Sequence, residues 1–181
     1  DGFQDAMLDL YDALEDCSDI LLEALALYLG EKKDVFTQII EKGNTILRLL
    51  YYPALEGTDI QPGAVRAAEH EDINFITLLP AATETGLQIK SPNSGWETVN
   101  APEGAMIINI GDMLQELTAN KLPSTTHRVI NPAGNAGRQA RITAPLFCHP
   151  EPSLQLSDRY TAGAYLKERL HEINARQMRA E

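Results

Sequence analysis

The sequence has few basic residues, no long apolar segment and only two cysteines. Lys and Arg together number 15 against 26 Asp and Glu, which gives a formal net charge of −11. Sequence-independent binding to nucleic acid needs a basic face that attracts phosphates, so we expect no nucleic-acid partner. No run of about 18 apolar residues occurs, so the sequence predicts no membrane-spanning helix.

The two cysteines, Cys17 and Cys148, lack the close spacing of a metal-binding or redox motif. We therefore expect two free thiols in a reducing cytoplasm. The first residues, DGFQDAML, are acidic and lack the basic segment that opens a signal peptide. These features predict a cytoplasmic protein with no membrane partner.

Helical periodicity occurs at both ends of the chain, and 44% hydrophobic residues over 181 positions suffice for one buried core. The first 30 residues predict one long amphipathic helix, and residues 34–42 predict a shorter one. Residues 161–177 predict a C-terminal helix. The apolar face of the first helix is expected at Phe3, Met7, Leu10, Leu14, Cys17 and Leu21, and that of the last at Tyr165, Leu166, Leu170 and Ile173.

Between these helices, short β-prone runs alternate with turn residues. The expected strands cover residues 45–52, 75–79, 87–90, 96–99, 105–110, 127–130 and 140–148, with a short helix over 112–120. Many short strands at this spacing indicate an antiparallel sandwich or barrel. The predicted fold class is therefore mainly β with flanking α-helices.

His70 and Asp72 lie two positions apart in AAEHEDINFITLLP. If this stretch is extended, both side chains project to one face while Glu71 points away. One further histidine from a distant strand, for which His127 in STTHRVINP is the candidate, would complete a set of two histidines and one carboxylate. Non-haem Fe(II) oxygenases use that ligand set, although an HxD pair alone is also common as a surface dipeptide.

Arg141 and Thr143 are expected on one face of a strand in QARITAPLF, with Ile142 on the other. A guanidinium beside a hydroxyl matches the bidentate needs of a carboxylate. The alternative for Arg141 alone is a surface salt bridge.

Most of the chain from about Thr45 to Pro150 resembles the isopenicillin N synthase-like branch of the Fe(II)/2-oxoglutarate oxygenases. The motifs follow the order of that family at close to its spacings. They are LRLLYYP (47–53), the HxD with ITLLP, GLQI (86–89), the Gly95-Trp96 turn, APEGAMIINIGDMLQELTANKLPSTTHRV (101–129) and the RxT with PLF.

The resemblance implies a double-stranded β-helix, or jelly-roll, core over residues 45–150. Residues 1–44 would form a helical lead-in that packs on this core, and residues 151–181 a C-terminal helical segment. The family has a further N-terminal region that contributes to the substrate pocket, and we expect it to be absent from this sequence.

The resemblance also implies roles for single residues. His70, Asp72 and His127 correspond to the Fe(II) ligands, and Arg141 and Thr143 to the family's RxS, which holds the distal carboxylate of 2-oxoglutarate. Tyr52 matches a tyrosine that helps to bind that carboxylate. Dioxygen would be the second cosubstrate, with ascorbate as a candidate reductant.

Three features depart from the family's pattern. Thr143 replaces the usual serine and keeps the hydroxyl, whereas Leu50 stands where many plant members have an asparagine that contacts the cosubstrate. The interval from His127 to Arg141 is 14 residues, and Pro132 to Gly137 is expected to form an enlarged loop.

Other conspicuous residues are expected to have structural roles. His149 and His171 are predicted not to bind the metal, and Trp96 to pack in its turn. Asp112 after Gly111 is predicted to cap a helix.

The leading hypothesis is an Fe(II)- and 2-oxoglutarate-dependent oxygenase that hydroxylates a small molecule and releases succinate and CO2. One alternative is an iron-dependent oxidase of the same fold that does not use 2-oxoglutarate. Another is a catalytically silent jelly roll that only binds a ligand. The identity of the substrate and the oligomeric state stay open.

Overall fold

The computed structural model describes residues 2–55, 63–80, 85–131 and 139–178. Its helices are α1 (Phe3–Tyr28), α2 (Val35–Glu41), α3 (Asp112–Leu117) and α4 (Ala162–Gln177). Its strands are β1 (Ile46–Leu47), β2 (Leu50–Tyr52), β3 (Ala67–His70), β4 (Ile76–Pro80), β5 (Leu87–Ser91), β6 (Gly95–Thr98), β7 (Met106–Ile110), β8 (His127–Val129), β9 (Arg141–Thr143) and β10 (Leu146–Cys148). The expected loop over 132–137 lies outside the described residues.

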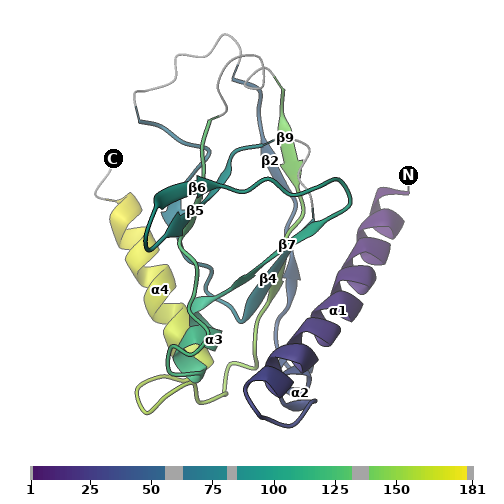
Figure 1. Ribbon diagram of the computed structural model, residues 1–181, viewed down its shortest axis with the longest axis vertical. Coiled ribbons are helices and arrows are strands. Elements are labelled where there is room, and N and C mark those ends of the chain that lie inside the picture. Colours follow the sequence, from purple (N-terminus) through teal and green to yellow (C-terminus); the bar gives the residue numbers. More distant parts are fainter. Residues whose placement is uncertain (1, 56–62, 81–84, 132–138, 179–181) are drawn as a thin grey trace.

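The strands form antiparallel sheets whose neighbours are distant in the sequence. One sheet has the order β1-β10-β4-β7, another β3-β8-β5-β6, and β2 pairs with β9. These sheets form the jelly-roll core, with α1 on one side of the strands and α4 on the other (Figure 1). The predicted fold class is confirmed.

The β2–β9 pair continues the β1–β10 pair of the first sheet, and Pro145 lies at the junction between them. The β1–β10 and β2–β9 pairs share a single register, in which Leu47 faces Leu146 and Leu50 faces Thr143. Between them the Arg48 N–H donates to the Pro145 carbonyl at 3.0 Å. Because proline has no N–H to donate in return, the ladder is interrupted at this point.

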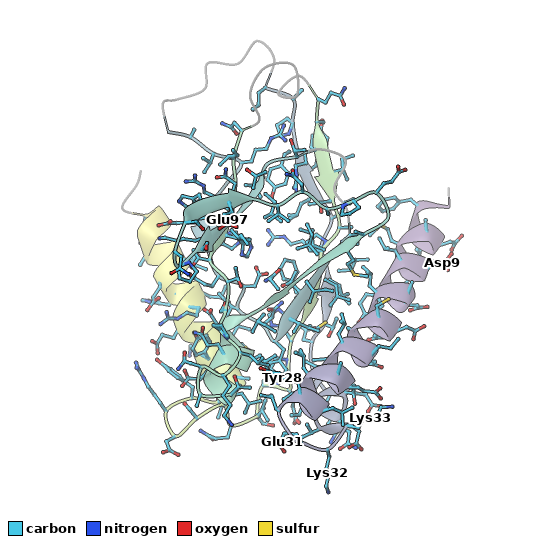
Figure 2. All side chains as sticks on the ribbon, in the orientation of Figure 1. Asp9, Tyr28, Glu31, Lys32, Lys33 and Glu97 are labelled. Carbon is cyan, nitrogen blue, oxygen red and sulfur yellow. The ribbon has the colours of Figure 1, made fainter. Side chains whose placement is uncertain are left out.

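Helix α1 packs on the core along one line of residues at steps of four. Its buried residues are Leu14, Ser18, Leu22 and Ala26, and the leucines and the alanine belong to the same hydrophobic cluster as Phe75 and Leu78 of the sheet. Of the predicted apolar face, Leu14 is buried and Leu10, Cys17 and Leu21 are partly buried against this cluster, whereas Phe3 is 67% exposed. The most buried line is therefore shifted around the helix from the predicted face. Side chains fill the space between the strands, whereas Asp9 projects from the outside of α1 (Figure 2).

Helix α4 covers the opposite side with a short contact. Tyr165 and Leu166 pack against the hydrophobic cluster, as predicted. Leu170 and Ile173, which were expected on the same buried face, are 48% and 41% exposed. Only the first turns of α4 therefore pack on the core. Among the described helices, none combines the length and apolar character needed to cross a membrane.

Candidate metal centre

His70 and His127 face each other across two paired strands. His70 ends β3, His127 begins β8, and the two residues are direct partners in this antiparallel pair. Partners on one rung project to the same side of a sheet, and the two ring centroids lie 4.3 Å apart. Strand pairing thus joins two histidines that are 57 positions apart in the sequence.

Asp72 completes this cluster from the segment that follows β3. Its Oδ1 lies 3.9 Å from His70 Nε2 and 3.7 Å from His127 Nε2. One ligand atom from each residue lies within 4.8 Å of the others. Atoms that each lie about 2 Å from one ion are at most about 4 Å apart, so binding of an ion would draw the three ligand atoms closer together. The three residues singled out by the HxD pattern and its distant histidine are therefore assembled.

Both imidazoles are oriented by main-chain carbonyls. His70 Nδ1 lies 2.7 Å from the Ala68 oxygen, and His127 Nδ1 lies 3.0 Å from the Thr125 oxygen. A carbonyl can only accept, so each Nδ1 carries the proton and donates it. In the neutral ring the lone pair is then on Nε2, which faces Asp72, and this is the tautomer that a metal requires.

The carboxylate of Asp72 uses its two oxygens differently. Its Oδ2 accepts hydrogen bonds from Thr77 Oγ1 at 2.6 Å and from Asn109 Nδ2 at 2.8 Å. Its Oδ1 is the atom that faces both histidines. One oxygen is thus held by the protein and the other is directed to the ligand cluster.

Arg141 and Thr143 lie side by side on the inner face of β9. Both are buried, at 2% and 6% exposure, whereas Ile142 between them is 43% exposed, which confirms the predicted alternation. Tyr52 is the direct strand partner of Arg141, and the guanidinium carbon lies 5.4 Å from the centroid of its ring. Burial lowers the pKa of Arg141, and the positive charge of Arg66 acts in the same direction.

The hydroxyl of Thr143 is buried without a hydrogen-bond partner. A buried polar atom without a partner costs free energy unless a ligand or an ordered water satisfies it. This hydroxyl and the neighbouring guanidinium form a donor set that fits a carboxylate. The residues present therefore fit the distal end of an oxo diacid.

Several polar residues of this region were not predicted from the sequence. Thr77 and Asn109 stand in the otherwise apolar runs ITLLP and MIINI, and this isolated polarity was a usable signal. Arg66 Nη2 donates to the Gln139 carbonyl at 3.1 Å, while its Nε and Nη1 are buried without partners. No pattern in the sequence distinguishes Arg66 from a surface arginine.

The remaining predicted residues lie elsewhere. His149 and His171 are not part of the metal-ligand cluster found among the described residues, and burial lowers the pKa of His149. Trp96 is on β6, where the Arg128 guanidinium packs 4.0 Å from its ring centroid.

The prediction that Asp112 caps a helix was wrong, because Gly111 occupies the cap position of α3. Asp112 instead accepts a hydrogen bond from Tyr165 of α4 at 3.3 Å, and burial raises its pKa.

The sequence of this chain is similar to those of known enzymes. The family model described as "2OG-Fe(II) oxygenase superfamily" matches residues 43–150. The rice protein "2-oxoglutarate-dependent dioxygenase 11" is 36% identical over 139 residues, which are 76% of this chain and 36% of that protein.

Solved structures share the fold over nearly the whole chain. A crystal structure of a Shewanella oneidensis protein has a TM-score of 0.81 at 44% identity and covers 96% of this chain and 66% of its own. A full-length Neurospora crassa protein in complex with alpha-KG and thymine has a TM-score of 0.82 at 31% identity, covering 95% and 57%. The chain spans half or less of the length of the curated relatives that it matches.

Proposed function

Because the chain belongs to the 2OG-Fe(II) oxygenase superfamily, we propose that it forms the catalytic core of an Fe(II)- and 2-oxoglutarate-dependent oxygenase acting on a small molecule. The observation that carries this proposal is the cluster of His70, Asp72 and His127, whose donor atoms lie within 4.8 Å of one another. Two imidazoles and one carboxylate, with the remaining positions open, are the ligand set of non-haem Fe(II) oxygenases.

His70, Asp72 and His127 would hold the iron through two Nε2 atoms and one Oδ1. Bound there, Fe(II) supplies the dioxygen chemistry that couples decarboxylation of 2-oxoglutarate, with release of succinate and CO2, to oxidation of the substrate, in most such enzymes as hydroxylation. The carbonyl contacts to both Nδ1 atoms keep the imidazoles oriented for this role.

Arg141 and Thr143 would bind the distal carboxylate of 2-oxoglutarate. The buried guanidinium neutralises the carboxylate charge, and the Thr143 hydroxyl, which has no protein partner, donates to it. Tyr52 lies on the same rung as Arg141, and its hydroxyl would donate a further hydrogen bond. These contacts would orient the oxo acid toward the metal.

Apolar residues around the centre would exclude water from the reaction. Val129 lies two positions beyond His127 on β8 and therefore shares its face, and Leu87 is its partner on β5. Both side chains are buried. A dry site strengthens the electrostatic contacts to the cosubstrate and protects reactive species.

The substrate is proposed to be a small organic molecule, since the Neurospora crassa protein was solved with thymine in addition to alpha-KG. We further propose that residues 1–44 are a helical lead-in, 45–150 the oxygenase core and 151–181 a C-terminal segment. The shared hydrophobic cluster of α1 and the sheets supports the first assignment. The two free cysteines are consistent with the proposed cytoplasmic location.

Binding measurements on two variants separate the metal site from the cosubstrate site. His70→Ala is expected to lose Fe(II) binding, with His171→Ala at an exposed position of α4 as the matched control that keeps it.

Arg141→Ala should keep Fe(II) but bind 2-oxoglutarate roughly 100-fold more weakly, because a buried charge pair loses one partner at a cost of about 3 kcal/mol. Arg141→Lys retains the charge without the fork and should fall between Arg141→Ala and the unmutated protein.

Normal Fe(II) affinity in His70→Ala would contradict the ligand assignment. Normal 2-oxoglutarate affinity in Arg141→Ala would contradict the cosubstrate assignment. An unmutated protein that binds Fe(II) but no 2-oxoglutarate would favour an oxidase of the same fold.

A further inference from the structure

We propose that Thr77 and Asn109 are positioning residues that fix Asp72 as a one-oxygen metal ligand, and that Asn74 sets the direction of the hydrogen bond from Thr77. The inference rests on the proposed metal site. It concerns the side of the carboxylate that faces away from the histidines.

The direction of each hydrogen bond follows from the chemistry of the groups. Asn74 Nδ2 can only donate, and it lies 2.9 Å from Thr77 Oγ1. The Thr77 hydroxyl accepts this bond and has a single proton left, which it donates to Asp72 Oδ2 at 2.6 Å. The chain of donors therefore runs from Asn74 through Thr77 to the carboxylate.

Asn109 reaches the same oxygen from the neighbouring strand. Thr77 on β4 and Asn109 on β7 are direct partners on one rung, so both side chains project to the same face. Asn109 Nδ2 donates to Asp72 Oδ2 at 2.8 Å. Two donors from two paired strands thus converge on one oxygen and fix the plane of the carboxylate.

Burial makes these contacts strong and keeps water from replacing them. Asn74, Thr77 and Asp72 are exposed by only 0%, 3% and 7%. Hydrogen bonds to an ionised group are about twice as strong as neutral ones, and a low local dielectric strengthens them further. The Asn74 amide is itself held, since it also donates to the Ile76 carbonyl at 3.1 Å.

The two carboxylate oxygens of Asp72 therefore have different roles. With two donors, Oδ2 is held by the protein, and Oδ1 is left as the only oxygen that faces both histidines. The site is therefore preorganised for single-oxygen binding by Asp72 before the metal arrives. Hydrogen-bond partners of metal ligands typically contribute 10–100-fold to metal affinity.

Titration with Co(II), followed by visible absorption without 2-oxoglutarate, measures this effect directly. Thr77→Val keeps the shape but removes the hydroxyl, and Thr77→Ser is the matched control that restores it. We expect Co(II) to bind about 10–100-fold more weakly to Thr77→Val and to Asn109→Leu. Thr77→Ser should stay within about threefold of the unmutated protein, since a 0.6 kcal/mol change corresponds to a factor of about three.

Thermal unfolding of the metal-free variants separates positioning from stability. A purely structural role would lower the unfolding temperature and leave the Co(II) affinity of the folded protein unchanged, and that result overturns the inference. If Thr77→Val does not fold, Asn109→Leu carries the test, because Asn109 is only partly buried. If the unmutated protein binds no Co(II), or if His70→Ala binds it equally well, the proposed metal site is wrong and this inference falls with it.

Discussion

At the scale of single residues, each proposed ligand has one polar atom hydrogen-bonded to the protein and a second polar atom that faces the proposed metal site. The Nδ1–H groups of His70 and His127 each donate to a main-chain carbonyl, and their Nε2 atoms face the proposed metal site. Asp72 Oδ2 accepts hydrogen bonds from two side chains, and Asp72 Oδ1 faces the two histidines. All three ligand atoms are therefore aimed by hydrogen bonds that the folded chain makes on its own.

Cys148 behaves differently, because nothing in the site uses it. Burial raises the pKa of its thiol to about 12 from an ordinary value of 9.0, although the neighbouring Ser18 hydroxyl acts in the opposite direction. We predict that Cys148 does not react with a thiol reagent at pH 8 until the protein unfolds. Half-buried Cys17 is the matched control that reacts in the native state.

The same pKa shift predicts a loss of stability in base. Above about pH 9 the unfolded thiol ionises while the folded thiol stays protonated, so the free energy of unfolding falls by about 1.4 kcal/mol per pH unit until about pH 12. Denaturant unfolding of the unmutated protein and Cys148→Ala between pH 8 and pH 10.5 measures this contribution as a difference in slope. Parallel pH profiles would contradict the assignment.

The sequence predicted those residues whose chemistry is visible in a local pattern. Alternation along a strand placed Arg141 and Thr143 on one face and Ile142 on the other. It could not reveal the support given to Asp72 by Asn109, because that contact depends on the pairing of β4 with β7. Arg66 was missed for the same reason, since its contact with Gln139 joins segments 73 positions apart.

At the scale of elements, the junction of β7 and α3 holds the segment that carries Asp72. The Gly111 N–H donates to the Phe75 carbonyl, and the Asp112 N–H donates to the Asp72 carbonyl, both at 2.8 Å. A Cβ on Gly111 would lie 2.2 Å from Asn74 Oδ1 and 2.4 Å from the Asn74 carbonyl oxygen. Gly111 is therefore required by the close approach of two main chains.

Gly111→Ala tests this junction. The added methyl group must push the segment of Asp72 away, so we expect a loss of about 3 kcal/mol in the free energy of unfolding and weaker metal binding. Gly104→Ala is the matched control, because a Cβ there meets nothing within 4 Å and only the positive φ of 76° costs energy, about 1 kcal/mol. Equal costs for the two variants in denaturant unfolding would show that the junction is not tightly packed.

The sequence predicted the elements better than their packed faces. The runs over 45–52 and 140–148 were correct as extended segments, and the break at Pro145 follows from its missing N–H. The buried line of α1 through Ser18, Leu22 and Ala26 was not predicted, because the surrounding strands and α2 decide which side of an apolar helix is covered. A leucine-rich helix offers more than one such side.

At the scale of the whole molecule, each of the three sheets contributes residues to the proposed site. Strands β3 and β8 supply the histidines, and β4 and β7 support Asp72. Strands β9 and β2 carry the residues proposed to bind the cosubstrate. Periodicity indicates many short strands but not their order. The resemblance to the oxygenase family predicted a jelly roll, which the structure confirms, and the strand order itself comes from the structure.

The central claim is that one site binds both the iron and the oxo acid. Its most direct test is anaerobic visible absorption while Fe(II) and then 2-oxoglutarate are added, with His70→Ala as the control. A charge-transfer band is expected only after both additions and only in the unmutated protein. The absence of that band from an unmutated protein that has bound Fe(II), or an equal band in His70→Ala, would contradict it.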